Sequence, residues 1–341
     1  MTAKATNLAL LLLVCLQLAT GVGAFLVGAP SLRPVIWLHS AGGFSLVLLF
    51  WWKRRIILRS LARHGPGIWA VPSAALLFLL GAVVFTGIAF STIGLPPIAG
   101  FPAMSAHVAL AVGTCIFLVT HAVARWPRVR RSDLVGRRTL LRTGALVAAG
   151  TVTWRLTEAT TAVLHLGGAM RRFTGSRPAA RFTGNAFPTS NWLTDDPVPL
   201  DTVAWRLTVS GHVQNRLSLS FADLKPEGSL DATLDCTGGW YSEQRWSGVS
   251  MSSLLQQAGI KSGARSVVVR ASTGYWRRYT LAEAQRAMLA THVGAEALSH
   301  EHGAPLRLVV TGKRGYEWVK WVTSIEVSTA SPLLKWPLPV S

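Results

Sequence analysis

Apolar residues are concentrated in the first half of the chain, where they form continuous runs. Four runs reach the roughly 20 residues that a bilayer-spanning helix needs: 8–27, 35–52, 68–90 and 104–124. A fifth run, at 140–166, is interrupted by Arg155 and Glu158, so its limits are less sharp. The pattern predicts an all-α transmembrane bundle of about five spans.

The second half alternates between apolar and polar residues over short stretches, which is typical of strands. Strands are expected at 201–213, 231–234, 265–270, 306–310 and 319–327, and short helices at 221–224, 251–257 and 281–289. Strands mixed with short helices, without βαβ regularity, indicate an α+β domain. The expected domain limits are 1–137 for the bundle, 138–181 for the fifth span and a basic linker, 182–330 for the α+β domain and 331–341 for a C-terminal tail.

The composition supports a membrane protein. Half of the 341 residues are hydrophobic, only 14% are charged, and the net charge is +19. A basic chain can bind nucleic acid, but these arginines cluster between apolar runs, as in cytoplasmic loops. We therefore expect no nucleic-acid partner. The N-terminus and the arginine-rich stretches 53–63 and 125–138 are expected in the cytoplasm, and five spans then place the α+β domain on the extracytoplasmic side of the cell membrane.

One cysteine stands out in the polar half. The predicted strand 231–234 leads to Cys236, and the turn Thr237-Gly238-Gly239 follows at once. Paired glycines adopt backbone angles that other residues resist, so the turn can present the sulfur at the edge of a pocket. The alternative is a buried small hydrophobic residue, a common role of cysteine.

Three segments bear on this choice. Cys236 is followed by Trp246-Ser247-Gly248-Val249 and a Leu-Leu pair; HGAPLR begins at residue 302 and GYEWVKWV at 315; and FTGNAFP spans 182–188. In this order they resemble the sulfite oxidase family of molybdopterin-dependent oxidoreductases. The resemblance covers about 182–327 and implies an α+β domain of the sulfite-oxidase molybdopterin-binding type with a molybdenum-molybdopterin cofactor.

The resemblance also implies site residues. Cys236 is the expected protein ligand of molybdenum, because a thiolate is a soft metal ligand. Residues expected to contact the pterin or its phosphate are Asn185, Phe187, Ser272, Thr273, His302, Arg307, Trp318, Val319 and Lys320. Without the resemblance, Asn185 is an ordinary turn residue and Lys320 part of a solvated basic face.

Departures from the family concern the substrate. Sulfite-oxidising members bind their anion with arginines, and this chain has Gly184 and the Trp240-Tyr241 pair at those places. Tyr241 and Arg245 join Cys236 as candidate catalytic residues, and Arg245 is a candidate to replace the missing charge. We expect a small neutral oxo substrate, such as a sulfoxide or an N-oxide, and not sulfite.

Histidines lie within the predicted spans, where an ionisable side chain is costly and a functional candidate. His107 and His121 are fourteen residues apart and share a helix face, about 21 Å apart along the axis. This spacing resembles the haem-ligand pattern of membrane b-type cytochromes. The matched depth of His39 and His107 predicts one haem b, and His121 is a candidate ligand for a second haem. The alternative is histidines that hydrogen-bond across helices.

A pair of arginines precedes the fifth run. Arg137-Arg138-Thr139-Leu140-Leu141-Arg142 resembles a twin-arginine export signal. Such a route would let a folded, cofactor-loaded domain cross the membrane. The alternative is the arginine-rich flank of an ordinary span.

Three functions compete at this stage. The first is a membrane-anchored molybdopterin oxidoreductase whose haem bundle exchanges electrons with a quinone or another membrane electron carrier. The second is a reductase of methionine sulfoxide in envelope proteins. The third is a non-catalytic membrane-anchored binding protein, which the presence of Cys236 disfavours.

Overall fold

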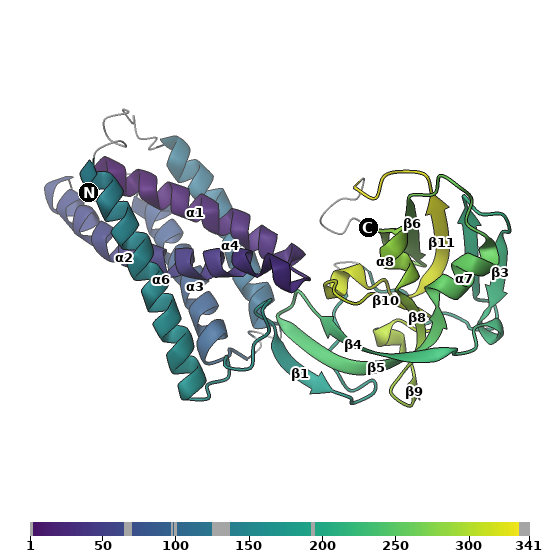
Figure 1. Cartoon of the computed structure of the whole chain (residues 1–341). Helices are drawn as coiled ribbons and strands as arrows, with labels where there is room; N and C mark the ends of the chain where they lie inside the picture. The colour runs from purple at the N-terminus through teal and green to yellow at the C-terminus, as the bar shows by residue number, and fades with distance from the viewer. Residues whose placement is uncertain are drawn as a thin grey trace. The chain divides into compact units, whose positions relative to one another are not determined.

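A computed structural model of the chain describes residues 3–64, 70–96, 98, 101–124, 137–191 and 195–333. The chain divides into two compact units, Met1–Arg177 and Pro178–Ser341 (Figure 1). The arginines expected in the loop 125–136, and residues 334–341 of the expected tail, lie outside the described residues.

The first unit is helical (Figure 1). Its helices are α1 (Ala3–Leu26), α2 (Arg33–His64), α3 (Ala70–Thr92), α4 (Ala103–Ala124) and α6 (Arg137–Val163), with a 3-10 turn, η1, at Pro30–Leu32. Helix α1 packs on α2, α3 packs on α4, and α6 packs on α2. The last contact depends on Gly150 of α6, because a Cβ there would lie 2.1 Å from Ser45 Oγ of α2.

Four of the described helices are long and apolar enough to cross a membrane. The candidate spans are Lys4–Leu26, Pro30–Arg59, Val71–Thr92 and Ala103–Val123. Large apolar side chains on them face outward, such as Phe78 at 73% and Ile116 at 64% exposure, as contact with lipid requires. These four helices indicate membrane association. The expected fifth span is not confirmed, since α6 carries four arginines and a glutamate.

The second unit contains two sheets. One has the order β1-β5-β8-β10, with β4 beside β5 and β9 beside β8, and the other has the order β3-β2-β11-β6-β7. The strands are β1 (Arg177–Arg181), β2 (Arg206–Gly211), β3 (Leu217–Ser220), β4 (Gly228–Asp235), β5 (Trp240–Ser250), β6 (Ser266–Ala271), β7 (Trp276–Thr280), β8 (Met288–Val293), β9 (Glu296–Ala297), β10 (Arg307–Val309) and β11 (Val322–Ser328). The helices are α7 (Met251–Ala258) and α8 (Leu281–Gln285), with 3-10 turns η2 (Phe221–Asp223), η3 (His300–His302) and η4 (Gly315–Glu317). The α+β prediction is confirmed.

The long hairpin of β4 and β5 positions the site, and one glycine allows it to join β8. The register between β5 and β8 shifts between Ser247 and Gly248. A Cβ on Gly248 would lie 2.0 Å from the Leu289 carbonyl oxygen, so only glycine fits this close approach. Trp246, the preceding inward-facing residue on β5, is fully buried in the core.

The expected strand 319–327 begins three residues late, at Val322. Trp321 has a φ of 49°, a left-handed conformation that interrupts an extended chain. Residues 315–321 instead form a 3-10 turn and an irregular segment, which brings Trp318 and Lys320 to the pocket described next.

Candidate functional site

Cys236 lies in the turn between β4 and β5. Its backbone N–H donates to the Trp240 carbonyl at 2.8 Å, and the Gly238 N–H donates to its sulfur at 3.3 Å. Gly239 has a φ of 89°, which a glycine adopts without strain. Burial raises the pKa of the Cys236 thiol, and coordination to a cationic metal would keep the sulfur as a thiolate.

A buried ion pair fixes this turn. Arg314 Nη1 donates to Asp235 Oδ1 at 2.6 Å, and its Nη2 donates to the Cys236 carbonyl at 3.0 Å. Both side chains are almost fully buried, at 5% and 6% exposure. The pair therefore joins the segment before η4 to the turn that carries the sulfur.

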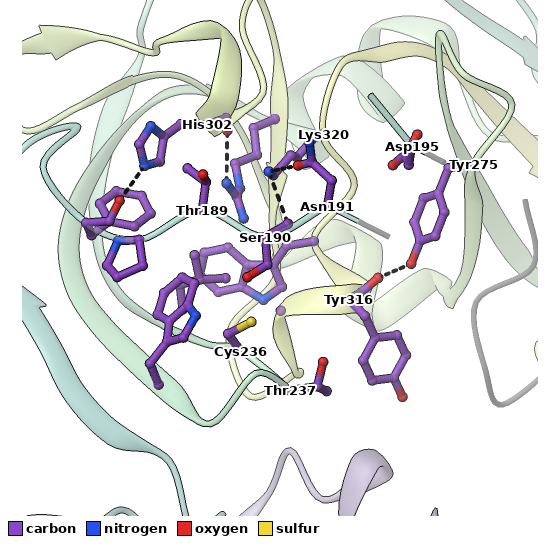
Figure 2. A pocket seen from close by; sticks show the side chains of 17 residues that line it. Thr189, Ser190, Asn191, Asp195, Cys236, Thr237, Tyr275, His302, Tyr316 and Lys320 are labelled. Carbon is purple, nitrogen blue, oxygen red and sulfur yellow. Dashed lines mark hydrogen bonds between the residues drawn. The ribbon is translucent and has the colours of Figure 1, made fainter. Parts of the chain in front are cut away.

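The Cys236 sulfur faces a pocket (Figure 2). Its walls come from residues 187–191 and 195, the turn of the β4–β5 hairpin, Tyr275 and the C-terminal stretch 302–320. Five of the described residues that line it are aromatic: Phe187, Trp240, Tyr275, Tyr316 and Trp318. The described basic side chains that line it are His302, Arg307 and Lys320.

Arg307 is held between two indole rings. Its Cζ lies 5.4 Å from the ring centre of Trp246 and 5.8 Å from that of Trp318. Nη1 donates to the His302 carbonyl at 2.9 Å, whereas Nε is buried without an acceptor among the described residues. Burial lowers the pKa of Arg307 to about 10. A buried donor without an acceptor costs about 1–3 kcal/mol, so this position suits an anionic or oxygen-rich ligand.

Trp318 presents a second such donor. Its Nε1 is also buried, with no acceptor in the part of the chain that the structure describes. Across the pocket, Asp195 has the opposite property, because its Oδ1 is a buried acceptor to which no described donor is bonded. Burial raises the pKa of Asp195. Together these groups offer two donors and one acceptor to a polar, ring-bearing cofactor.

Lys320 adds a charge on the same wall. Its Nζ donates to the carbonyls of Ser190 and Glu301, at 3.2 and 2.7 Å, and to Asn191 Oδ1 at 2.6 Å. Burial, with the nearby charge of Arg307, lowers the pKa of Lys320 to about 7. An anion bound here would favour the charged ammonium.

His302 organises the pocket without offering a ring nitrogen to it. Nε2 donates to the Phe187 carbonyl at 3.1 Å, and Nδ1 accepts from Ser299 Oγ at 2.7 Å. Burial lowers the pKa of His302 to about 4, so the ring is neutral near pH 7. The ring also packs against Phe187, with centroids 4.0 Å apart.

The helical unit brings two of its histidines together. The ring centroids of His39 and His107 are 6.3 Å apart. His39 Nδ1 bonds to Thr20 Oγ1 at 3.0 Å, and His107 Nδ1 bonds to Thr86 Oγ1 at 3.1 Å. These contacts leave Nε2 of each ring as the nitrogen for a metal.

Comparison with known proteins identifies the family. Residues 195–336 match the model of the oxidoreductase molybdopterin-binding domain. The chain is 31% identical over 137 residues to "Uncharacterized oxidoreductase YuiH" of Bacillus subtilis, a match that covers 39% of this chain and 69% of that protein. The chain belongs to the oxidoreductase molybdopterin-binding domain family.

Two further relatives are similar over shorter shares of their length. The chain is 26% identical over 151 residues to the "Putative protein-methionine-sulfoxide reductase subunit YedZ1" of Azospira oryzae, covering 43% of this chain and 58% of that protein. It is 29% identical over 203 residues to chicken (Gallus gallus) sulfite oxidase, covering 47% of this chain and 44% of that protein. The chain thus spans about half the length of these two relatives.

Membership of the molybdopterin-binding family makes the chain an oxidoreductase that uses a molybdenum cofactor, with no substrate specified. The pocket fits this cofactor. Arg307 Nε and Trp318 Nε1 are buried donors in need of acceptors, and the pterin group offers ring and phosphate oxygens. The sulfur of Cys236 lies on the same pocket.

The pocket contains six of the residues that the sequence associates with the molybdopterin-binding family: Cys236, Phe187, His302, Arg307, Trp318 and Lys320. Asn185 does not line it. Its side chain donates to Glu296 Oε2 and the Ala297 carbonyl, both at 2.9 Å, and accepts from the Ser299 N–H at 3.0 Å. Asn185 therefore anchors the loop before Phe187 to the segment before His302.

Four other expected residues also lie off the pocket wall. Val319 is fully buried, and its carbonyl accepts from the Leu308 N–H at 2.8 Å. Ser272 donates its N–H to the Trp321 carbonyl at 2.9 Å, and Thr273 bonds to Asp195. Tyr241 pairs with Asp235 across the hairpin.

Arg245, a candidate substrate-binding charge, is directed elsewhere. On β5 the side chains of residues 242, 244 and 246 are buried, and Arg245 is exposed on the opposite face. It forms a bidentate pair with Asp231, at 2.7 and 2.9 Å. Strand alternation thus prevents Arg245 from replacing the arginines of sulfite-oxidising relatives.

The sequence did not single out Ser190, Asn191 or Asp195. They follow Phe187 in a stretch rich in Pro, Asn and Asp, where no spacing indicated which side chains turn inward. Arg314 was also missed. Its role depends on a buried pair with Asp235, 79 residues earlier in the chain.

Proposed function

We propose that the chain is a membrane-anchored molybdopterin oxidoreductase that transfers oxygen to or from a small neutral molecule. The observation that supports this most directly is the composition of the pocket. Its cations are engaged within the wall, by the indole rings around Arg307 and by the three acceptors of Lys320. Trp240, Phe187 and Thr237 line the part near the sulfur with neutral groups.

The protein's residues have distinct tasks in this proposal. Cys236 is the protein ligand of molybdenum, and the bound metal supplies two-electron oxo transfer. Arg307 and Trp318 donate hydrogen bonds to the pterin and its phosphate. The Lys320 ammonium, whose three donors are engaged within the wall, attracts the phosphate by its charge. His302, through Phe187, fixes the aromatic wall beside the sulfur.

The substrate is not sulfite in this proposal. Gly184 and the Trp240-Tyr241 pair occupy places where sulfite-oxidising relatives carry arginines, and Arg245 is paired with Asp231. A sulfite anion would lack the charged partners that would replace its hydration. A sulfoxide or an N-oxide is neutral and presents one polar oxygen, which suits an aromatic pocket.

The helical unit would hold one haem b between His39 and His107, which would supply one-electron transfer with a quinone or another membrane carrier. The separation of the two rings supports this assignment. If α6 crosses the membrane as a fifth span, the molybdenum domain is extracytoplasmic. The Arg137-Arg138 pair at the start of α6 is then placed as in a twin-arginine export signal.

A second candidate is a reductase of methionine sulfoxide in envelope proteins. It is favoured by the similarity to the relative named as a methionine-sulfoxide reductase subunit. The neutral pocket is compatible with a sulfoxide side chain. Binding without catalysis, the third alternative, is disfavoured because the chain belongs to an oxidoreductase family.

Metal and haem analysis of the purified full chain, followed by an oxo-acceptor screen with a reduced dye, tests these functions. We expect molybdenum, b-type haem, and oxidation of the dye by dimethyl sulfoxide or an N-oxide. Faster turnover of oxidised protein than of free methionine sulfoxide would select the second candidate. Sulfite oxidation at a comparable rate would contradict the neutral-substrate assignment.

A further inference from the structure

The four apolar helices consist of two copies of one helical hairpin. Thr20-Gly21 on α1 recurs as Thr86-Gly87 on α3, 66 residues later, and His39 on α2 recurs as His107 on α4, 68 residues later. In each copy the threonine hydroxyl bonds to histidine Nδ1. In each copy the glycine lies beside the ring, since an added Cβ would be 3.4 or 3.1 Å from Cε1.

The apolar packing between the hairpins also pairs residues that are 66 or 68 positions apart. One apolar cluster contains three equivalent pairs of residues: Leu10 with Leu76, Val14 with Leu80, and Phe50 with Leu118. The repeat is therefore a property of the whole hairpin and extends beyond the histidine end.

At the other end of the four helices, a polar residue on the second helix of each hairpin again bonds to one on the first, but the residue types differ between the two copies. Lys53 lies fourteen residues after His39, and His121 lies fourteen after His107. Lys53 Nζ donates to Asn7 Oδ1, and His121 Nδ1 bonds to Ser73 Oγ at 3.3 Å. Asn7 and Ser73 are 66 residues apart, as are Thr20 and Thr86. The second end thus has a lysine at the position where the repeat would place a histidine.

We propose that the Lys53–His121 end binds a quinone headgroup and not a second haem, an inference that rests on the proposed electron-transfer role of the bundle. A lysine ammonium has three N–H donors and no lone pair, so it cannot ligate iron. Lys53 and His121 can instead both donate to carbonyl oxygens. A quinone carries two carbonyls on opposite sides of its ring, which suits donors from two repeat-related hairpins.

The surroundings of this end fit a lipid-soluble ligand. Leu46, seven residues from both His39 and Lys53, lies in the apolar cluster that separates the two ends. Trp51 and Trp52 are exposed at 67% and 46%, next to Lys53. Tryptophan favours the boundary between lipid and water. A headgroup at Lys53 would therefore have its apolar tail in lipid.

Photolabelling of the full chain in lipid nanodiscs with a short-chain azidoquinone tests the site. We expect labelled peptides from the start of α1, from α2 near Lys53 or from α4 near His121, with labelling suppressed by excess unmodified quinone. Lys53→Met should weaken binding about tenfold or more, because a hydrogen bond from a charged donor is lost, and His121→Phe about fivefold. Arg33→Met, which removes a cation from the opposite end of α2, should leave the affinity unchanged.

Haem content separates this inference from the proposed haem assignment. We expect one haem per chain by pyridine haemochrome assay, retained in Lys53→Met and His121→Phe and lost in His39→Ala. A second haem that disappears in His121→Phe would overturn the inference, as would labelling that neither substitution changes. A wild-type chain without haem would refute the haem assignment, and the labelling pattern would still decide the quinone site.

Discussion

Individual residues determine how the Cys236 sulfur meets the pocket. Arg314 holds both the Asp235 carboxylate and the Cys236 carbonyl, and Gly238 donates to the sulfur. The position of the sulfur is therefore set by Arg314, Asp235 and Gly238, which are not among the residues that line the pocket. Replacing the sulfur alone should leave this scaffold in place.

Cys236→Ser is expected to give a folded protein that retains the pterin, has altered molybdenum coordination and loses turnover. The hydroxyl is a harder and less readily ionised ligand than the thiol. Molybdenum spectroscopy and the dye-linked assay measure the two effects. Cys115→Ser, a change in α4 away from this pocket, is the matched control. An unchanged molybdenum signal and rate in Cys236→Ser would remove Cys236 as the ligand.

Lys320 gives a pH-dependent prediction for the cofactor-free chain. Its pKa is about 7 in the folded protein and near 10.5 when exposed. Between these values the unfolded chain holds a proton that the folded chain has released, so stability should rise with pH from about 7 to 10.5. Below pH 7 both states are protonated, and Lys320 adds no slope.

Thermal unfolding of the full chain in detergent, followed by tryptophan fluorescence, measures this dependence. Lys320→Met should flatten the rise, and Lys4→Met should preserve it. A bound phosphate should also flatten it, because an anion restores the charged lysine. A rise of equal slope in Lys320→Met would show that other groups are responsible.

The sequence located the pocket residues that belong to recognisable motifs, including Cys236, Arg307 and Lys320. It could not show which way a side chain points. Asn185 stands in a matching motif, yet it bonds outside the pocket. Its backbone N–H donates to Glu296 Oε2, and its side-chain oxygen accepts from the Ser299 N–H. Arg245 follows Cys236 closely but faces solvent, because it lies on the exposed face of β5, a strand that was not among those expected.

At the scale of elements, α6 is defined by its contact with α2. Gly150 of α6 is buried against Ser45, whereas Gly144, nearly two turns earlier, has no neighbour within 4 Å of an added Cβ. These two glycines provide a matched pair on one helix.

Gly150→Leu should destabilise the helical unit by about 1–3 kcal/mol, the usual cost of overpacking a close contact. Gly144→Leu should be neutral or slightly stabilising, because leucine favours a helix more than glycine does. Thermal unfolding in detergent, followed by far-ultraviolet circular dichroism, compares the variants. Equal melting temperatures for both variants would contradict a tight α2–α6 contact.

The strong periodic signals predicted elements well, and the irregular ones did not. Long apolar runs gave α1 to α4, and the short strand patterns gave most of β2 and β6 and half of β4. Residues 319–321 were assigned to a strand, because the left-handed conformation of Trp321 depends on tertiary contacts. Its indole Nε1 donates to the His300 carbonyl at 3.0 Å, a contact that the local sequence does not reveal.

At the scale of the whole molecule, the number of spans determines the side on which the molybdenum domain lies. With α1 to α4 alone, both termini are on one side of the membrane. If α6 also crosses, they are on opposite sides. Two properties of α6 point in opposite directions. Its length suits a membrane span, whereas its interior carries the charged pair Arg155 and Glu158, 2.8 Å apart.

Reporter fusions decide between four and five spans. A reporter active only in the cytoplasm should be active at the N-terminus and silent after Ser341 if α6 spans. Replacing Arg137 and Arg138 by lysines should then reduce export of the domain, if the pair is a twin-arginine signal. Activity at both ends would establish four spans and a cytoplasmic molybdenum site.

Two buried donors in the pocket, which lack acceptors until the cofactor binds, make the stability of the protein depend on cofactor loading. Before loading, Arg307 Nε and Trp318 Nε1 have no described acceptor, and each such group costs about 1–3 kcal/mol. A ligand that binds only the folded state removes this cost and adds its own binding energy. Empty chains therefore unfold more often and meet proteases sooner than loaded ones. A cell short of molybdenum should contain fewer copies of this protein, even at an unchanged rate of synthesis.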